Sequence, residues 1–381
     1  MSTRRLALGL GPPVSRMTAV ILLLAAALSG CYGAGATASS EDSTTLGPGI
    51  STASGGPRAA LQRAGALTGV TWLAEGPRGW EAGQIGGGRV ALARAEVGIA
   101  ASDGWILSAV LRPIGSTRLL IRDGPAADAK AVDLASLAPT ATVIVGDRAY
   151  VSGFAFANAR DPGIVEVDLD AATSRVILPP SGAGGTRSLA ASPDGSTLVS
   201  SLCDFASDPE PETCSLTVVP LDGAAPRSLG KVAGGFLRGT SSTVAVVAPQ
   251  GAEPPTWIAG IDLATGRELW RLTAEEFGPS VMTRDHGLIQ QRLRIDGPKP
   301  SLVIDAIDLR TGTSRSLYEE TASAPRVLWP ALCSETNIAI GEDATGSRAL
   351  AASDDGRTAV RLVPIDGGNP VDVQLALRSE P

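Results

Sequence analysis

The chain has 381 residues and a formal charge of −7, from 32 Lys and Arg against 39 Asp and Glu. Proteins that bind nucleic acids usually carry a basic stripe that neutralises the phosphates. This sequence has no basic run and only three lysines. Its charge therefore argues against nucleic acid as a partner.

The N-terminal segment has the layout of a secretory signal. Arg4, Arg5 and Arg16 precede an uncharged apolar run, Thr18–Leu28. A membrane-spanning helix needs roughly 20 apolar residues, so this run is too short to span a bilayer. It has the length of a signal-peptide core, which is followed by small residues and a cleavage site. We predict that residues 1–30 are a signal peptide, whose removal would change the charge from −7 to −10.

The end of this run, Leu28-Ser29-Gly30-Cys31, resembles the lipobox of bacterial lipoproteins. The resemblance implies that the thiol of Cys31 receives a diacylglycerol and that Cys31 becomes the new N-terminus. The protein would then be anchored on the extracytoplasmic face of the cell membrane, because acyl chains contribute about 0.8 kcal/mol per buried methylene. The alternative is an ordinary secreted protein in which a cysteine falls here by chance.

Residues 31–66 are rich in glycine, serine, threonine and alanine and contain almost no large apolar side chain. Such a segment buries too little surface to offset its chain entropy. We therefore expect a flexible tether between the lipidated cysteine and a folded domain at 67–381.

The body at 67–381 consists of short apolar runs separated by Gly, Pro, Asp and Ser, as in "RVALARAEVGIAAS", "TRLLIRDG" and "SLVIDAIDL". These runs have the length and the turn punctuation of β-strands. Only Arg58–Ala66 hints at a helical apolar period. The sequence predicts an all-β domain.

Internal repeats define the unit of this domain. An Asp-x-x-Thr pattern followed by Gly or Ser begins at Asp170, Asp262 and Asp308, with separations of 92 and 46 residues. A unit of about 46 residues holds four short strands, which is the size of a propeller blade. Division of the body by this unit predicts seven blades, with six as the alternative.

Two further elements also repeat. "SLAASPDGSTLV" at Ser188 matches "ALAASDDGRTAV" at Ala349, and "VVPLDG" at Val218 matches "LVPIDG" at Leu362. The first copy carries 17 more residues between the two elements than the second copy. This insertion is either a contact loop or a neutral decoration.

The segment Ile261–Leu272 resembles the repeat of quinoprotein-type (PQQ-like) β-propellers, and the Ser-Pro-Asp-Gly turn is similar to that of TolB-like and WD-repeat propellers. The resemblance implies a β-propeller and assigns no catalytic residue. Within the motifs we expect structural roles: glycines at positive φ, Asp and Thr side chains bonded to turn backbone, and a tryptophan packed between blades. These residues are Asp170, Thr173, Asp194, Gly195, Asp262, Thr265, Gly266, Trp270, Asp308, Thr311, Gly312, Asp355 and Gly356.

Four cysteines are present. Cys203 and Cys214 bracket "DFASDPEPET" between two strand-like runs, so a hairpin would place them opposite each other within reach of a disulfide. The bond would persist in an oxidising compartment, and the alternative is a pair of reduced, packed thiols. Cys333 lies in an apolar run and is expected to be a core thiol rather than a reactive one.

Several chemistries find little support. His286 is the single histidine, no Gly-x-Ser-x-Gly elbow surrounds a serine, and no Walker-type Gly-Lys-Ser/Thr occurs. A zinc site with several histidines is therefore impossible. Quinoprotein dehydrogenases, whose fold this chain resembles, are much longer, and many of them carry an adjacent cysteine pair over the cofactor. This chain has no adjacent cysteines, so we expect no quinone and predict no cofactor. A calcium-dependent lactonase site stays open through Asn158, Asn337 and Asn369.

The sequence thus predicts a non-enzymatic, lipid-anchored β-propeller of the cell envelope. It would bind a protein, peptide or glycan on one propeller face. The alternative is a propeller hydrolase or lyase that acts on an envelope sugar or lactone. Arginine- and alanine-rich, lysine-poor usage suggests a high-GC actinobacterial source.

Overall fold

The computed structural model describes most of the chain between Thr71 and Ala376. The described ranges are 71–76, 79–84, 88–102, 104–112, 116–135, 137–155, 161–181, 186–203, 213–249, 255–283, 287–295, 301–321, 328–333, 337–342, 357–364 and 371–376. The predicted signal peptide, tether and lipid attachment site at Cys31 lie outside these ranges. No helix in the described ranges is long and apolar enough to cross a membrane.

All elements in the described ranges are strands. The first sheet contains β1 (Thr71–Gly76), β2 (Gly79–Gln84) and β3 (Arg89–Ala91). The next three sheets contain β4 (Val97–Ser102), β5 (Trp105–Arg112), β6 (Ser116–Asp123) and β7 (Lys130–Leu134); β8 (Leu137–Val145), β9 (Arg148–Ala155), β10 (Ile164–Asp168) and β11 (Thr173–Leu178); and β12 (Thr186–Ala191), β13 (Thr197–Cys203), β14 (Thr213–Pro220) and β15 (Arg227–Ala233). The last three contain β16 (Phe236–Thr240), β17 (Val244–Ala248), β18 (Trp257–Asp262) and β19 (Glu268–Thr273); β20 (Glu276–Thr283), β21 (Gly287–Arg294), β22 (Ser301–Ile307) and β23 (Ser314–Thr321); and β24 (Leu328–Cys333), β25 (Asn337–Glu342), β26 (Arg357–Pro364) and β27 (Val371–Ala376).

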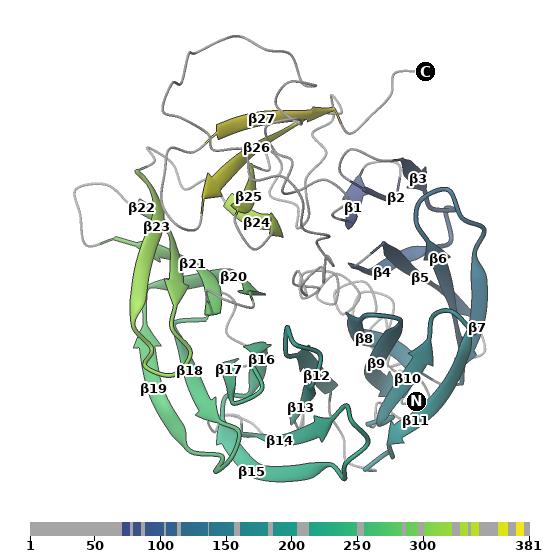
Figure 1. Cartoon of the computed structure of the whole chain (residues 1–381), viewed down its shortest axis with the longest axis horizontal. Helices are drawn as coiled ribbons and strands as arrows, with labels where there is room; N and C mark the ends of the chain where they lie inside the picture. The colour runs from purple at the N-terminus through teal and green to yellow at the C-terminus, as the bar shows by residue number, and fades with distance from the viewer. Residues whose placement is uncertain are drawn as a thin grey trace, which may run out of the picture.

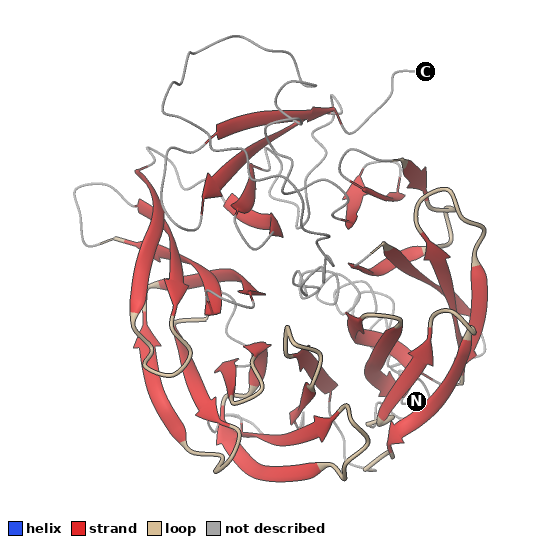
Figure 2. Cartoon of the chain, viewed as in Figure 1, coloured by secondary structure: helices blue, strands red, loops and turns tan. Residues whose placement is uncertain are grey.

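The sheets form a ring in chain order (Figures 1 and 2). Each four-stranded sheet is antiparallel and runs from an inner strand near the centre to an outer strand at the rim. This arrangement confirms the predicted all-β propeller architecture. The predicted number of blades stays a prediction, because part of the chain lies outside the described ranges.

Apolar side chains between neighbouring sheets hold the ring together. Between β16–β19 and β20–β23, for example, Trp270, Phe277, Met282 and Leu288 form one buried cluster. Each blade thus buries its two faces against the next blades, as the uninterrupted apolar runs of the middle strands require.

The two ends of the ring are different. A blade with four alternating strands returns the chain to the end at which it entered, so all inner strands of complete blades run in the same direction. The backbone N–H of Leu237 in β16 accordingly donates to Ser188 Oγ at the same level of β12 (3.2 Å). We call the end at which β4, β8, β12, β16 and β20 begin the variable face, and the opposite end the motif face.

The repeat motifs lie at the motif face, in the turns between third and fourth strands. In the β18–β19 turn, Asp262 Oδ1 accepts from the N–H of Ala264 (2.8 Å), and Oδ2 accepts from Thr265 Oγ1 (2.8 Å). Gly266 has φ of +73°, which a residue with a side chain adopts only with strain. The turn after β22 repeats this pattern with Asp308, Thr311 and Gly312.

Trp270 connects two blades. Its indole Nε1 donates to the carbonyl oxygen of Leu309 (2.7 Å), and its ring lies against Gly312 in the turn of the next blade. A Cβ on Gly312 would lie 2.6 Å from Trp270 Cγ, so the glycine is needed for contact as well as for its φ of +70°.

The prediction that Asp170 and Thr173 form the motif of the β10–β11 turn is wrong. Asp168, not Asp170, closes it by accepting the N–H of Ala171 (2.8 Å), and Ala172 occupies the position of Gly266 with φ of +51°. Thr173 is the first residue of β11 rather than part of the turn. The predicted alignment is shifted by two residues because Asp168-Leu169-Asp170 offers two aspartates near the turn.

Asp194 and Gly195 lie in the β12–β13 turn, which is also at the motif face. Asp194 Oδ1 accepts from Ser192 Oγ (2.5 Å) and from the backbone N–H of Ser196 (3.0 Å), while Gly195 has φ of +68°. Asp355 and Gly356, the predicted counterparts, lie outside the described residues.

Candidate functional site at the variable face

The disulfide lies at the variable face, opposite the repeat motifs. Cys203 ends β13 and pairs in register with Cys214 of β14, and the two residues are bonded. Their side chains are buried. The bond therefore closes the connection 204–212 at its base, and that connection itself lies outside the described residues.

The disulfide also supports the entry into the next blade. Gly234 and Gly235 join β15 to β16 and have φ of +69° and +119°. A Cβ on Gly235 would collide with Cys214 Cβ and would lie 2.8 Å from its Sγ. The backbone that starts the inner strand β16 therefore passes directly over the disulfide.

Arg238 lies on β16, three residues after Gly235. The strand bulges at Arg238, because the register with β17 shifts between Leu237 and Gly239. Its guanidinium lies 5.7 Å from the centre of the Phe236 ring, at the outer limit of a cation–π contact. Similar register shifts occur near the start of β4, β8, β20 and β24, and such bulges redirect side chains.

A buried ion pair holds the neighbouring loops at this face. Arg187 on β12 binds Asp161, which precedes β10, through Nε to Oδ1 (2.5 Å) and Nη2 to Oδ2 (2.7 Å). Asp161 also accepts the backbone N–H groups of Gly163 (2.9 Å) and Ser181 (3.0 Å). The carboxylate thus joins the β9–β10 connection, the crossover after β11 and the inner strand β12.

The protonation of Asp161 follows from these contacts. Burial alone would raise its pKa, but the hydrogen bonds from Arg187, Ser181 and Gly163 and the charge of Arg187 outweigh burial and lower the pKa to about 2. Asp161 is therefore a carboxylate at neutral pH with each of its oxygens paired. It serves as an anchor and is not placed as a general base.

A second charged cluster lies at the crossover into β4. Glu96 Oε2 accepts from Ser108 Oγ (2.6 Å), and Arg122 contacts both carboxylate oxygens at 2.9–3.0 Å. Burial opposes ionisation, whereas the hydrogen bonds from Arg122 and Ser108 prevail and lower the pKa of Glu96. This cluster fixes the residues that begin the inner strand of another blade.

These contacts form a recurring layer beneath the variable face. Second strands carry a buried polar residue that binds a segment of that face. Ser108 binds Glu96, Ser152 Oγ donates to the carbonyl oxygen of Gly163 (2.6 Å), Ser200 Oγ accepts from Arg187 (2.7 Å), and Gln290 Nε2 donates to the carbonyl oxygen of Gly278 (2.8 Å). The layer fixes the described backbone at which these connections begin and end.

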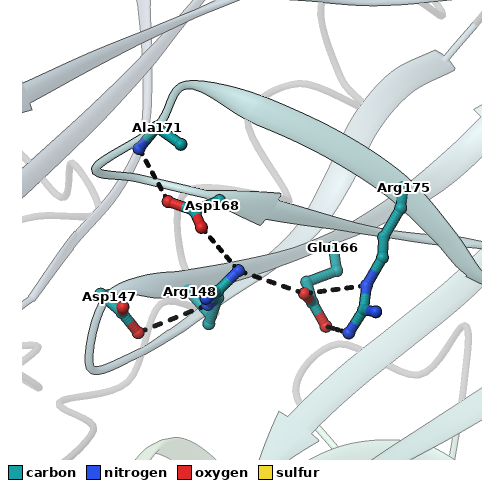
Figure 3. Close-up of polar contacts among 6 residues, drawn as sticks. All are labelled: Asp147, Arg148, Glu166, Asp168, Ala171 and Arg175. Carbon is teal, nitrogen blue, oxygen red and sulfur yellow. Dashed lines mark hydrogen bonds and ion pairs between the residues drawn. The ribbon is translucent and has the colours of Figure 1, made fainter.

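The motif face has a different character (Figure 3). There Arg148 on β9 lies between Asp168 (2.8 Å) and Glu166 (3.5 Å), and Arg175 on β11 binds Glu166 through Nε and Nη2 (3.1 and 3.0 Å). Asp147 completes this group at the turn. The ion pairs link three strands of one blade, and the side chains of Arg148 and Arg175 are partly or largely exposed, so each pair adds little stability.

The structure therefore places the described residues of the predicted blade motifs and the disulfide at opposite faces. His286, Asn158 and Asn369 lie outside the described residues, and Cys333 and Asn337 lie on β24 and β25 without described side chains. Sequence reasoning missed Asp161, Arg187 and Glu96. Their only signal was a charged residue near an apolar run. Within the described ranges, no group of three His, Cys, Asp or Glu side chains is close enough to hold a metal ion.

Comparison with solved structures confirms the fold. The β-propeller domain of the Trilobed protease from Pyrococcus furiosus superposes with a TM-score of 0.51 over 80% of this chain and 96% of that chain, at 9% identity. The chain is a β-propeller. At this identity the likeness concerns the fold alone.

Two other solved structures are also similar to this propeller. Oligogalacturonate lyase from Vibrio parahaemolyticus matches with a TM-score of 0.48 at 13% identity, over 71% of this chain and 74% of that chain. TolB from Acinetobacter baumannii matches with a TM-score of 0.39 at 14% identity, over 78% and 79%. No protein-family model and no curated protein matches the sequence.

Proposed function

We propose that this propeller is a lipid-anchored, non-enzymatic binding module of the cell envelope that holds a partner at its variable face. The lipobox at Leu28–Cys31 supports the anchor. The separation of the two faces supports the location of binding, because the repeated turns that build the blades lie at the other end of the ring. Proteins commonly place binding residues on loops that a rigid scaffold positions.

The observation that carries this proposal is the disulfide at the base of the connection 204–212. Cys203 and Cys214 are buried at the two ends of this connection, and Cys214 supports the crossover at Gly235. A closed base limits the conformations of the connection and so lowers the ordering cost of binding.

The chemistry of this connection indicates the kind of partner. Its sequence contains four acids and no basic residue: Asp204, Asp208, Glu210 and Glu212. Like charges close together favour a partner that brings positive charge. We infer a basic protein or peptide surface as the partner of the variable face.

Site-specific photo-crosslinking in membranes of the native host tests the proposal. A photoreactive residue at position 206 probes the connection and leaves its acids unchanged. A matched probe at the exposed Ala264 lies at the motif face. We expect a discrete crosslinked product from position 206 only, and we expect the variant Asp204→Asn/Asp208→Asn/Glu210→Gln/Glu212→Gln to lose it. Equal products from both probes would contradict the proposal.

The anchor has a separate test. Cys31→Ser should release the protein from the membrane, because the lipid would be absent. Retention of this variant in membranes through a high-salt wash would refute lipid anchoring. The crosslinking result would stand independently, since it depends on the face and not on the anchor.

A further inference from the structure

Asp305 is a buried carboxylate at a position where other blades carry apolar side chains. It lies on β22, three residues before the motif aspartate Asp308, and is only 2% exposed. The equivalent residues, three positions before the aspartates of the β10–β11 and β18–β19 turns, are Val165 and Ala259. A buried charge is costly unless it is well paired. The construction of a blade therefore does not account for Asp305.

Arg292 on β21 is the ion-pair partner of Asp305. In the antiparallel pairing of β21 and β22, Asp305 lies opposite Gln290, so Arg292 is its diagonal neighbour on the same face of the sheet. That face is turned toward the blade β16–β19, because Phe277, which lies opposite Arg292, packs in one cluster with Ile258. The Nε of Arg292 donates to Asp305 Oδ2.

The second oxygen of this carboxylate has no partner. Asp305 Oδ1 is buried and accepts no hydrogen bond. Ser280 and Gln290 stand in the same cross-strand row but direct their donors elsewhere. Gln290 Nε2 donates to the carbonyl oxygen of Gly278 (2.8 Å). Ser280 Oγ donates to the carbonyl oxygen of Arg238 (3.1 Å).

The other buried carboxylates among the described residues are paired with arginine through both oxygens. These pairs are Asp161 with Arg187, Glu96 with Arg122, and Glu166 with Arg175. Two-point pairing is the stronger geometry for arginine and a carboxylate. Arg292 would reach it by placing an Nη group on Asp305 Oδ1. The observed geometry instead leaves Oδ1 unpaired and keeps both Nη groups away from Asp305.

The two Nη groups of Arg292 reach solvent. In the part of the chain that the structure describes, no residue accepts a hydrogen bond from either group, and neither is a buried atom. The side chain is 27% exposed, and Arg292 lies close to the end of β21 at the variable face. A guanidinium held through Nε presents its Nη groups as a planar fork, which matches the shape of a carboxylate.

We propose that Arg292 binds a carboxylate at the variable face through Nη1 and Nη2, and that Asp305 is the residue that positions it. Charge indicates the ligand class. Asp305 offsets much of the charge of Arg292, so the site attracts a second negative charge only weakly, whereas a dianion such as phosphate loses more hydration than a carboxylate does. A singly charged, planar group is therefore favoured.

This inference deepens the proposed function and rests on it only for the source of the carboxylate, which we place on the same partner protein. The partner would then carry basic residues that face the connection 204–212 and an acidic group that faces Arg292. Two contacts of opposite sign fix the orientation of a partner better than one, since a reversed orientation brings like charges together.

An NMR titration of the full chain carrying Cys31→Ser tests the site. The Nε–H signals of Arg292 and of a control, Arg271, are followed on addition of acetate, acetamide or inorganic phosphate at constant ionic strength. Arg271 is 36% exposed, but Glu268 occupies its Nε and Nη2. We expect a saturable shift of Arg292 with acetate, and at least ~5-fold weaker binding of phosphate. We expect no saturable shift with acetamide, and none at Arg271.

Two variants separate the fork from its positioning, with acetate binding followed at the backbone amide of Val303. Arg292→Lys keeps the charge but removes the fork, so acetate should bind at least ~5-fold more weakly. Asp305→Asn removes a negative charge, which by itself would strengthen acetate binding. Because the variant also loses the group that holds Nε, we expect weaker binding instead.

Four results would overturn the proposal. They are the absence of a saturable shift at Arg292, an equal shift at Arg271, binding of phosphate or acetamide as tight as that of acetate, and unchanged or tighter acetate binding in Asp305→Asn. If a variant unfolds, the titration of the unsubstituted Arg292 against Arg271 still decides. Acetate binding at Arg292 without a crosslink from position 206 would leave this site in place and refute the proposed function. The reverse outcome would refute the site alone.

Discussion

Arg187 and Asp161 form a two-point ion pair between neighbouring blades, with side chains only 5% and 0% exposed. The pair joins an inner strand to two segments of the variable face, and Ser200 completes it from β13. Its energetic importance can be measured, because removal of one partner leaves the other charge buried and unpaired.

Asp161→Asn should destabilise the propeller by about 3–5 kcal/mol, the usual range for breaking a buried ion pair. The matched control is Asp147→Asn, since Asp147 is 56% exposed and its ion pair with Arg148 adds little. Urea denaturation of both variants measures the difference. Equal stability of the two variants would show that the buried pair contributes nothing.

The same ion pair predicts that the stability of the folded protein depends on pH in the acid range. The folded pKa of Asp161 is about 2, below its ordinary value of 3.8, so ionisation favours the folded state. This contribution, roughly 2 kcal/mol, is fully present above pH 3.8 and is lost as the pH falls toward 2. Denaturation midpoints between pH 2 and 5 should therefore fall less steeply in Asp161→Asn than in the wild type. Parallel curves would exclude Asp161 as a source of the acid sensitivity.

Ala172→Gly should stabilise the protein by about 0.5–1 kcal/mol. Ala172 has φ of +51° in the turn after β10, where its counterparts Gly266 and Gly312 have φ of +73° and +70°. Glycine removes the strain of a side chain in this region, and the gain exceeds the entropy that glycine adds to the unfolded chain. Ala171→Gly, one residue earlier, should be neutral or destabilising. A thermal melt distinguishes the two variants. A lower melting temperature for Ala172→Gly than for the wild type would contradict the claim that the positive φ of Ala172 strains the turn.

Gly235→Ala should be more harmful than Gly223→Ala. Both glycines have positive φ, at +119° and +90°, so both substitutions introduce backbone strain. Only at Gly235 would the new methyl group meet the disulfide, whereas nothing lies within 4 Å at Gly223. We expect Gly235→Ala to cost about 1–3 kcal/mol more, the typical penalty of overpacking. Equal losses would mean that the crossover does not rest on Cys214.

The sequence predicted those features that contiguous residues encode. The turn at Asp262 was found because its aspartate, threonine and glycine lie within five residues and recur at Asp308. The disulfide was found because a hairpin brings its cysteines together. The pair of Asp161 and Arg187 was not found, because the two residues are 26 positions apart and no repeat marks either one.

The misplaced turn at Asp170 has a physical reason as well. The pattern Asp-x-x-Thr fits Asp170 and Thr173, but the turn closes through the backbone N–H of Ala171 on Asp168. The hydrogen bond that closes the turn, and not the spacing of residues in the sequence pattern, determines which aspartate stabilises the turn. A second feature beyond sequence reasoning is the hydrogen bond from the N–H of Gly104 to Thr71 Oγ1, which joins the β4–β5 turn to the start of β1.

The most direct measurement of the central claim compares crosslinking at the two faces with and without the disulfide. The photoreactive residue is placed at position 206 or at Ala264, in the wild type and in Cys203→Ser/Cys214→Ser. The account predicts one crosslinked product from position 206 whose yield falls several-fold without the disulfide, while amide exchange of β4–β11 stays unchanged. A product whose yield is unaffected by the disulfide, or one formed equally from Ala264, would contradict binding at a clipped variable face.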